Sequence, residues 1–441
     1  MSAWKAGVAS RPITPPVGLE MSGFAAREGV STGVLDDLWV RALSFSCGGD
    51  RTVIASLDLL GVDSAVVDAI RRKAAQIGKI DTGRIVVSAT HTHAGPAVLR
   101  NALLGKADEK YLARLVDASV GAIVEAIQGE TDVCLSVGSA TCASVGSNRR
   151  DPKGPVDKRV YVLRVDARGK TIALLVNYAC HAVAMGPQNT HFSSDYVHFT
   201  RLSLEQAFPD SYAVFTNGAA GNINTGHSAQ ASITGQVAGR TYADAERIGL
   251  ELGRAAVLAA KSAVERRGDA VECSGIPFAS SNLLLPLQSP QTPEEYAAEA
   301  ARWDERAAEL LAQGDAGSAA TARARGVWAR RMAESPSLPL FAQGEMVAFR
   351  IGPAVFVTFP GEAFVEFGLA MRNCAPDWPV FVLGYTGGAL GYVPTEEAIK
   401  VGGYEADDSF RFYGLPAPYT LGSYSIAQGN GERLVNEVTA M

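Results

Sequence analysis

The chain has 441 residues, of which 47% are hydrophobic and 20% charged, and its formal net charge is −6. This composition is ordinary for a globular protein with a sizeable core and excludes general disorder. Lysine and arginine are scattered, so we expect no nucleic-acid partner. No apolar run is long enough to cross a bilayer, and we therefore expect no stable membrane association and a cytoplasmic location.

Short β-branched runs alternate with longer helical patterns along the chain. This alternation predicts an α/β fold of mixed β-sheets flanked by helices. In chain order the expected elements are a strand at 51–56, a helix at 64–77, a strand at 84–89, a helix at 109–128, strands at 159–165 and 171–177, a helix at 192–208, a strand at 212–216, a helix at 243–267, and strands at 346–351, 354–359 and 380–384. No internal repeat is apparent.

The length permits one elaborated domain or two, and we expect a single domain over residues 1–441. Residues 291–334 differ from their surroundings, being rich in Ala, Glu and Arg with a glycine-containing turn in the middle. This pattern predicts a helical hairpin inserted between strands. Such an insertion fits a packing appendage, a lid or a partner-binding arm, and a homo-oligomer is possible.

The six cysteines are dispersed, mostly in apolar settings, and have no C-x-x-C spacing. Because secreted disulfide scaffolds place cysteines far more densely, we expect six reduced and mostly buried thiols. Cys180 directly precedes a histidine and is interpreted as a small core residue rather than a nucleophile.

Histidines follow the ends of two predicted strands. The strand at 84–89 leads directly into His91 and His93, whose i, i+2 spacing puts both rings on one side of an extended segment. A second apolar strand is followed within a few residues by His181. Histidine is the commonest metal ligand, and strand ends of α/β sheets are where ligands gather. The residues alone leave two interpretations open, a metal site or hydrogen-bonded structural histidines.

Two further strand ends carry polar side chains. Glu362 follows the strand at 354–359 at the start of a helical pattern, where an acid also has a structural explanation at the helix N-terminus. Tyr392 follows the strand at 380–384 after a glycine-rich segment that permits unusual backbone angles. Position alone does not assign either residue as a metal ligand.

A small-residue loop and an arginine pair complete the candidates. Asn222 and Asn224 lie in the loop after the strand at 212–216, whose amides and backbone N–H groups suit a polar pocket. The neighbouring Arg149 and Arg150 supply guanidinium groups that suit a carboxylate or a developing oxyanion, although Arg150 also fits a surface charge.

These segments, in this order, resemble the neutral/alkaline (non-lysosomal) ceramidase family in its catalytic region. The matching pieces are SATHTHAGP, SNRR, NYACHAV followed by FSSDY, FTNGAAGNIN, FPGEAF and GYVPTEEAIKVGGYEA, and the opening ITPPVGLEMSGFAAR is similar to short bacterial members. The resemblance implies one zinc ion held by His91, His181, Glu362 and Tyr392 and a metal-activated water that cleaves an amide. It also implies that His93 faces the reacting group and that Arg149 contacts the substrate.

The substrate loop departs from the family pattern, because Asn222 and Asn224 stand where the family typically has Asp and then Ser. We therefore expect a zinc-dependent, amidase-like hydrolase acting on a soluble small molecule rather than strictly on ceramide. His93 or Asp195 would handle the proton, and Arg149 with the asparagine loop would steady the oxyanion. Asp58 and Asp195 are also candidates for orienting the histidines. The alternatives are a metal-dependent lyase or glycoside-active enzyme on the same site and a non-catalytic zinc-binding relative.

Overall fold

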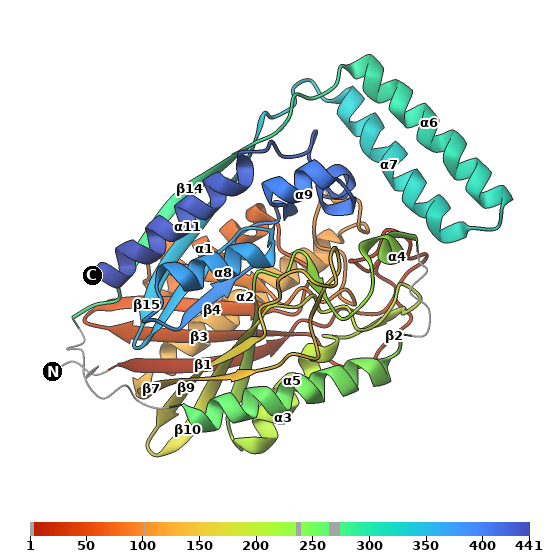
Figure 1. Cartoon of the computed structure of the whole chain (residues 1–441). Helices are drawn as coiled ribbons and strands as arrows, with labels where there is room; N and C mark the ends of the chain where they lie inside the picture. The colour runs from red at the N-terminus through yellow and green to blue at the C-terminus, as the bar shows by residue number, and fades with distance from the viewer. Residues whose placement is uncertain (1–3, 101, 235–239, 264–273) are drawn as a thin grey trace.

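The computed structural model describes residues 4–100, 102–234, 240–263 and 274–441. It confirms an α/β fold in which three principal sheets are flanked by helices (Figure 1). The first sheet has the order β5-β4-β3-β1-β6, the second β12-β10-β9-β7 and the third β14-β15-β16-β18. Their strands are β1 (Lys5–Pro12), β3 (Trp39–Cys47), β4 (Asp50–Leu57), β5 (Ile85–Ala89), β6 (Thr131–Asp132), β7 (Cys134–Thr141), β9 (Arg159–Ala167), β10 (Lys170–Tyr178), β12 (Tyr212–Asn217), β14 (Phe278–Pro286), β15 (Phe341–Ile351), β16 (Ala354–Thr358) and β18 (Val380–Leu383).

The three sheets share one connectivity. In each, two successive antiparallel pairings are followed by a helix and then by a parallel strand, as β3-β4-α1-β5, β9-β10-α3-β12 and β15-β16-α8-β18 illustrate. A second helix follows each parallel strand. The six helices are α1 (Ser64–Gly78), α2 (Glu109–Gln128), α3 (Tyr196–Ala207), α5 (Tyr242–Ser262), α8 (Val365–Cys374) and α11 (Ser423–Ala440). The chain therefore contains three similar βββαβα units that its sequence does not reveal.

The inner faces of the three sheets meet in a common apolar cluster. Phe45 of the first sheet, Leu175 of the second and Phe356 of the third are all fully buried in it. The outer face of each sheet packs against its own helix pair, as α2 does on β1 and β3 and α11 does on β14 and β15 (Figure 1). This arrangement brings the carboxyl ends of the three parallel pairs, β4–β5, β10–β12 and β16–β18, to one region of the molecule.

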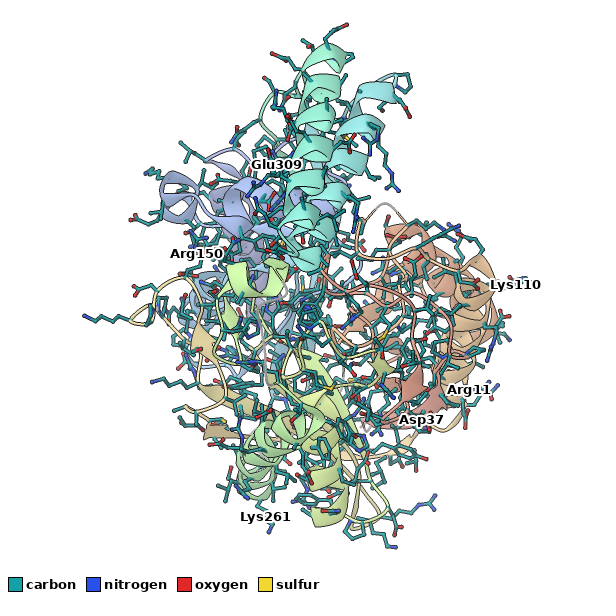
Figure 2. All side chains as sticks on the ribbon, turned by 90° about the vertical axis from the view of Figure 1, so that its right-hand side faces the viewer. Arg11, Asp37, Lys110, Arg150, Lys261 and Glu309 are labelled. Atoms are coloured by element: carbon teal, nitrogen blue, oxygen red, sulfur yellow. The ribbon has the colours of Figure 1, made fainter. Side chains whose placement is uncertain are left out.

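The predicted hairpin is present and stands out from the sheets, with Glu309 on its exposed side (Figure 2). It consists of α6 (Pro293–Ala312) and α7 (Ala316–Glu334), joined by a short turn at Gly314. Thr292 caps α6 in a capping box with Glu295, and Asp315 caps α7 by accepting from the backbone N–H of Ser318. Its root packs on the segment that follows the glycine-rich loop, through Trp328 and Phe410.

Two helix boundaries differ from the prediction. The helix expected at 192–208 begins at Tyr196, because Asp195 has a φ of 58° and caps the helix from outside. Residues 191–192 instead form β11 (His191–Phe192). The helix expected at 243–267 ends at Ser262, and residues 264–267 lie outside the described part of the chain.

Short elements connect the sheets. They are β2 (Gly33–Val34), η1 (Thr82–Arg84), β8 (Ser147–Asn148), β13 (Ile223–Asn224), α4 (Ala229–Thr234), β17 (Glu362–Ala363), β19 (Tyr392–Val393), α9 (Glu396–Val401), η2 (Tyr404–Asp408) and α10 (Ser409–Phe412). Within the described residues, every helix is too short or too polar to span a bilayer.

The expectation of six reduced thiols is wrong for Cys47, which is disulfide-bonded. Cys142 and Cys180 are buried thiols, and Cys374 is a half-buried one. Cys273 lies outside the described residues. Dispersed spacing did not exclude a single covalent link, because sequence separation says nothing about which cysteines the fold brings together.

Candidate metal centre

Three histidines and a glutamate meet where the carboxyl ends of the three parallel pairs come together. His91 follows β5 in the first unit, His181 follows β10 in the second and Glu362 follows β16 in the third. Tyr392, in β19, pairs directly with Glu362 in a short parallel bridge. Each unit thus contributes at least one polar side chain to a single point, and all four candidate ligands inferred from the resemblance lie together.

The distances between their donor atoms suit one small cation. His181 Nε2 lies 3.1 Å from Glu362 Oε2 and 3.1 Å from the Tyr392 hydroxyl, and His91 Nε2 lies 3.3 Å from the same carboxylate oxygen. Four N and O donors at about 2.0–2.1 Å from a tetrahedral ion lie roughly 3.3–3.4 Å from one another. The Oε2 atom of Glu362 is buried without a hydrogen-bond donor, as a ligand atom awaiting a cation would be.

Backbone carbonyls orient two of the histidines. His91 Nδ1 lies 2.6 Å from the Leu60 carbonyl oxygen, and His181 Nδ1 lies 2.8 Å from that of Ala220. When Nδ1–H donates to a carbonyl, the Nε2 lone pair is left for a metal, which is the usual arrangement of ligating histidines. The carbonyls belong to the loops after β4 and β12, so each ligand is held by the loop that follows the neighbouring parallel strand.

His93 differs from the other two histidines. Its Nε2 lies 3.2 Å from His91 Nε2, and His91, His93 and His181 form the group of described residues whose ligand atoms could together hold a metal ion. However, His93 Nδ1 is buried and has no hydrogen-bond partner. Burial, reinforced by the neighbouring His91 and His181, lowers the pKa of His93 well below its usual range, so its imidazole is neutral.

Charge in the centre is concentrated on Glu362. Burial opposes ionisation of this carboxyl, but His91 and His181 outweigh that effect and hold its pKa well below the usual range. The Tyr413 hydroxyl donates to the other oxygen, Oε1. Burial lowers the pKa of His181 to about 4, so this imidazole is neutral at physiological pH. A neutral imidazole beside a carboxylate suits a divalent transition metal.

Arg149 and Tyr404 line the cavity beside the centre, together with His93 and Tyr392. Arg149 Nε lies 2.7 Å from Glu405 Oε1, and Arg149 Nη2 donates to the Gly221 carbonyl at 2.9 Å. Burial alone would lower the pKa of Arg149, but Tyr392 and Glu405 raise it above its ordinary value. A fully charged guanidinium therefore stands beside the candidate metal ligands.

Four of the predicted residues have other partners. Both oxygens of Asp195 accept from backbone N–H groups, of Ala184, Met185 and Tyr196, and the residue is not on the cavity wall. Asn222 bonds Glu366 and the backbone N–H of Val365, and Asn224 stabilises the turn to His227. Their amides are thus engaged in structural bonds. Similarly, Asp58 pairs with Arg201 and does not reach the histidines.

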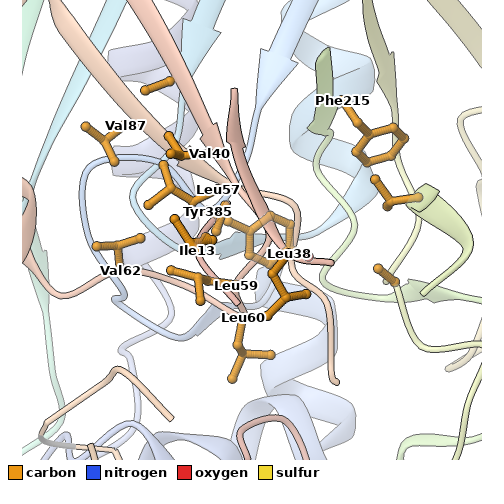
Figure 3. Packing of buried hydrophobic residues seen from close by; sticks show 14 of the residues in the cluster. Ile13, Leu38, Val40, Leu57, Leu59, Leu60, Val62, Val87, Phe215 and Tyr385 are labelled. Carbon is orange, nitrogen blue, oxygen red and sulfur yellow. The ribbon is translucent and has the colours of Figure 1, made fainter. Parts of the chain in front are cut away.

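Sequence reasoning did not assign roles to several residues that surround the centre. Tyr385 stacks on His91 with ring centroids 4.0 Å apart, and Tyr413 binds Glu362. Figure 3 shows Tyr385 among buried hydrophobic residues that include Leu59 and Leu60. Phe24, from the N-terminal loop, meets His93 edge-on with centroids 5.1 Å apart. Two of these residues stood inside quoted motifs, Phe24 in ITPPVGLEMSGFAAR and Tyr404 in GYVPTEEAIKVGGYEA, where an aromatic residue offered a signal.

A family model described as neutral/alkaline non-lysosomal ceramidase, N-terminal, matches residues 4–239, which is more than half of the chain. The chain belongs to this family. The neutral ceramidase of Drosophila pseudoobscura pseudoobscura is 26% identical over 231 residues, which cover 47% of this chain and 33% of the relative. The match thus spans about a third of that ceramidase.

Solved ceramidase structures share the fold over the whole chain. The crystal structure of neutral ceramidase from Pseudomonas aeruginosa has a TM-score of 0.72 at 19% identity, and covers 100% of this chain and 75% of that one. A ceramidase complexed with C2 has a TM-score of 0.71 at 18% identity, with the same coverage. At such identities the likeness shows the fold alone, which these ceramidases and the present chain have in common.

Proposed function

We propose that this protein is a zinc-dependent amidase of small molecules, with His91, His181, Glu362 and Tyr392 as the zinc ligands. The observation that carries the proposal is the convergence of these four side chains with donor separations of 3.1–3.3 Å at a buried point. Family membership supports hydrolysis of an amide. When bound, the ion would acidify a water molecule enough to make it a nucleophile at neutral pH.

The other residues around the centre would transfer the proton and stabilise the developing charge. His93 would take the proton of the attacking water, because its imidazole is neutral and its Nε2 lies within 3.2 Å of a ligand atom. It would then pass that proton to the leaving amine nitrogen as the C–N bond breaks. Arg149 and the Tyr404 hydroxyl would stabilise the charge that develops on the carbonyl oxygen. Asp195 is left out of this scheme, since backbone N–H groups occupy its carboxylate.

Metal analysis of three proteins tests the ligand set. We expect about one zinc per chain in the wild type, a large loss in His181→Ala and retention in His93→Ala, since only the former removes a proposed ligand. On amide substrates both variants should lose activity, by about 10²–10⁴-fold for His93→Ala if it is the base. Equal metal content in the wild type and His181→Ala would remove His181 from the shell.

A substrate panel tests the reaction class. The zinc-loaded wild type should hydrolyse amides in preference to esters, lactones and glycosides. Turnover of glycosides, or elimination products, would favour the alternative chemistry on the same site. Tight zinc binding without turnover of any class would instead indicate a binding protein that has lost catalysis.

A further inference from the structure

The cavity beside the candidate metal centre has two chemically distinct halves. Its polar half consists of His93, His181, Arg149, Tyr392 and Tyr404. The other part of the lining is apolar, and its residues are Gly23, Phe24, Ala25, Leu104, Val183 and Ala229. A reacting carbonyl at the polar half would therefore place one of its substituents against the apolar half.

The cavity as a whole is small. The cavity has a volume of about 20 Å³ available to the centre of a water molecule. This is little more than the roughly 10–15 Å³ that a single water needs by the same measure. The Phe24 ring is part of the wall, is only 4% exposed and lies edge-on to His93. Even an acetyl group therefore needs a slight widening of the cavity, and a long hydrocarbon chain cannot enter while this ring stays in place.

Several contacts fix the Phe24 ring. The Arg27 guanidinium lies 5.0 Å from the ring centroid, and it donates to the carbonyls of Ser22 and His93 at 2.7 and 2.8 Å. Gly23 has a φ of 108°, and a Cβ there would come within 2.7 Å of His93, so the loop backbone lies directly on that residue. Ser22 N–H donates to the Gly95 carbonyl. The wall is thus anchored to the same segment that carries two of the histidines.

We propose that Phe24 is a specificity-determining residue that limits the substrate to amides of short apolar acyl groups, of about acetyl size. The apolar character of the wall favours an uncharged substituent, and its closeness to His93 excludes a longer one. This inference rests on the proposed amidase function, because the acyl group is placed by assuming that a carbonyl reacts at the metal centre.

Acyl-length selectivity tests the proposal. Wild type and Phe24→Ala are compared on acetyl, butanoyl and octanoyl amides of one chromogenic amine. We expect the wild type to prefer acetyl, and Phe24→Ala to raise the octanoyl-to-acetyl ratio of kcat/KM by about tenfold or more, since one methylene in an apolar pocket changes selectivity by roughly 10–200-fold. Phe199→Ala removes a phenylalanine that is 8% exposed and lies away from the cavity, and its ratio should equal that of the wild type.

A binding measurement separates failure of this inference from failure of the proposed function. Acetohydroxamate and octanohydroxamate chelate zinc whether or not the protein turns over amides, and calorimetry on the zinc-loaded protein gives their relative affinities. The wild type should bind acetohydroxamate more tightly, and Phe24→Ala should reverse or abolish that preference. Phe24→Leu, a milder change, should give an intermediate ratio and serves if the alanine variant does not fold. Equal affinity of the wild type for both ligands, or an unchanged ratio in a folded Phe24 variant, overturns the proposal.

Discussion

Three residues have a positive φ, which only glycine adopts freely, two of them at the centre and the third at the start of α3. His91, Asp195 and Tyr385 have φ values of 66°, 58° and 56°. Such conformations typically cost of order 1–3 kcal/mol each and persist only where the surroundings enforce them. Here backbone hydrogen bonds do so, since the His91 N–H donates to Leu59 and the Tyr385 N–H to Gly361. These backbone conformations place the rings of His91 and Tyr385 in a stack and direct the His91 side chain towards the other candidate ligands.

Asp195 provides a prediction about stability rather than catalysis. Burial raises the pKa of Asp195 to about 6, even though three backbone N–H groups donate to its oxygens. Because the folded-state pKa exceeds the unfolded value of about 3.9, the fold binds this proton more tightly. The resulting stability is complete below about pH 4 and is lost as the pH rises through about 6, and a shift of two units corresponds to roughly 3 kcal/mol.

The Asp195→Asn variant isolates this contribution. An asparagine oxygen can accept from one side, but its NH₂ group opposes the N–H of Met185, so we expect destabilisation of about 1–3 kcal/mol. Denaturant unfolding of both metal-free proteins measures the difference in unfolding free energy. That difference should be largest near pH 4 and should shrink towards pH 7. A difference that grows with pH would show that Asp195 is stabilised in its charged form instead.

At the scale of elements, the strands of the three parallel pairs were predictable and several antiparallel strands were not. The strands β4, β5, β10, β12, β16 and β18 correspond to predicted runs, because both of their faces are buried and their sequences are dense in Val, Ile, Leu and Phe. The strands β1, β3, β6, β7 and β14 were missed. The sequences of β1 and β7, KAGVASRP and CLSVGSAT, are rich in Ala, Ser and Gly and have exposed positions, and only pairing with a neighbour makes them strands.

The same distinction explains which site residues were found. His91, His181 and Glu362 directly follow predictable strands, and the rule that ligands gather at strand ends singled them out. Phe24 and Tyr413 reach the centre from loops and short helices hundreds of residues apart, and no local pattern connects them. Likewise, the hydrogen bonds that occupy Asn222 and Asn224 depend on Glu366 and on a tight turn, which composition cannot predict.

The helical hairpin is coupled to the site at its root. Trp328, which is 1% exposed, stacks edge-on with Tyr296 and Phe410 and donates its indole N–H to the Leu415 carbonyl. Residues 404–413, which include Tyr404 and Tyr413, lie directly before this contact. The hairpin root is also tied to them by the ion pairs of Arg325 with Asp408 and Arg411 with Glu299.

We therefore expect Trp328→Ala to disturb the centre from a distance. Removal of a buried tryptophan costs about 3–5 kcal/mol, here concentrated on the hairpin root and on residues 404–413. Hydrogen exchange should accelerate in that segment, and zinc affinity should fall because Tyr413 steadies Glu362. Leu310→Ala makes a smaller cavity in the hairpin cluster with Ala307 and Ala319, and should leave exchange in 404–413 unchanged. Equal effects of the two variants on that segment would contradict the proposed coupling.

At the scale of the whole molecule, the centre lies where three units of the same connectivity meet. Corresponding loops carry different residues. The loop after the parallel strand contains His91 in the first unit, residues 218–222 in the second and Tyr385 in the third. The sequence shows no repeat because the units preserve strand order and not residue identity, and strand order is visible only when pairing is known. The resemblance to the family identified the candidate ligands, but it did not reveal that the three units share one connectivity.

This geometry makes the metal a link between all three units, and its effect on stability should be global. A ligand that binds only the folded state stabilises it by RT ln(1 + [L]/Kd), or about 2.7 kcal/mol at a hundredfold excess over Kd. Zinc should therefore raise the thermal unfolding midpoint of the metal-free protein and slow hydrogen exchange in the loops after β5, β10 and β16 together. His181→Ala should lose this response.

His198→Ala is the matched control, because His198 faces Asp36 at 3.6 Å, is one-third exposed and lies outside the centre. It should keep the full zinc-dependent rise in the unfolding midpoint. If His181→Ala responded to zinc as strongly as His198→Ala, the ion would be binding elsewhere. If exchange slowed in the loop of one unit alone, the metal would not join the three sheets. The stabilisation must appear in all three loops because a ligand set drawn from His91, His181 and Glu362 cannot form unless the three units are docked.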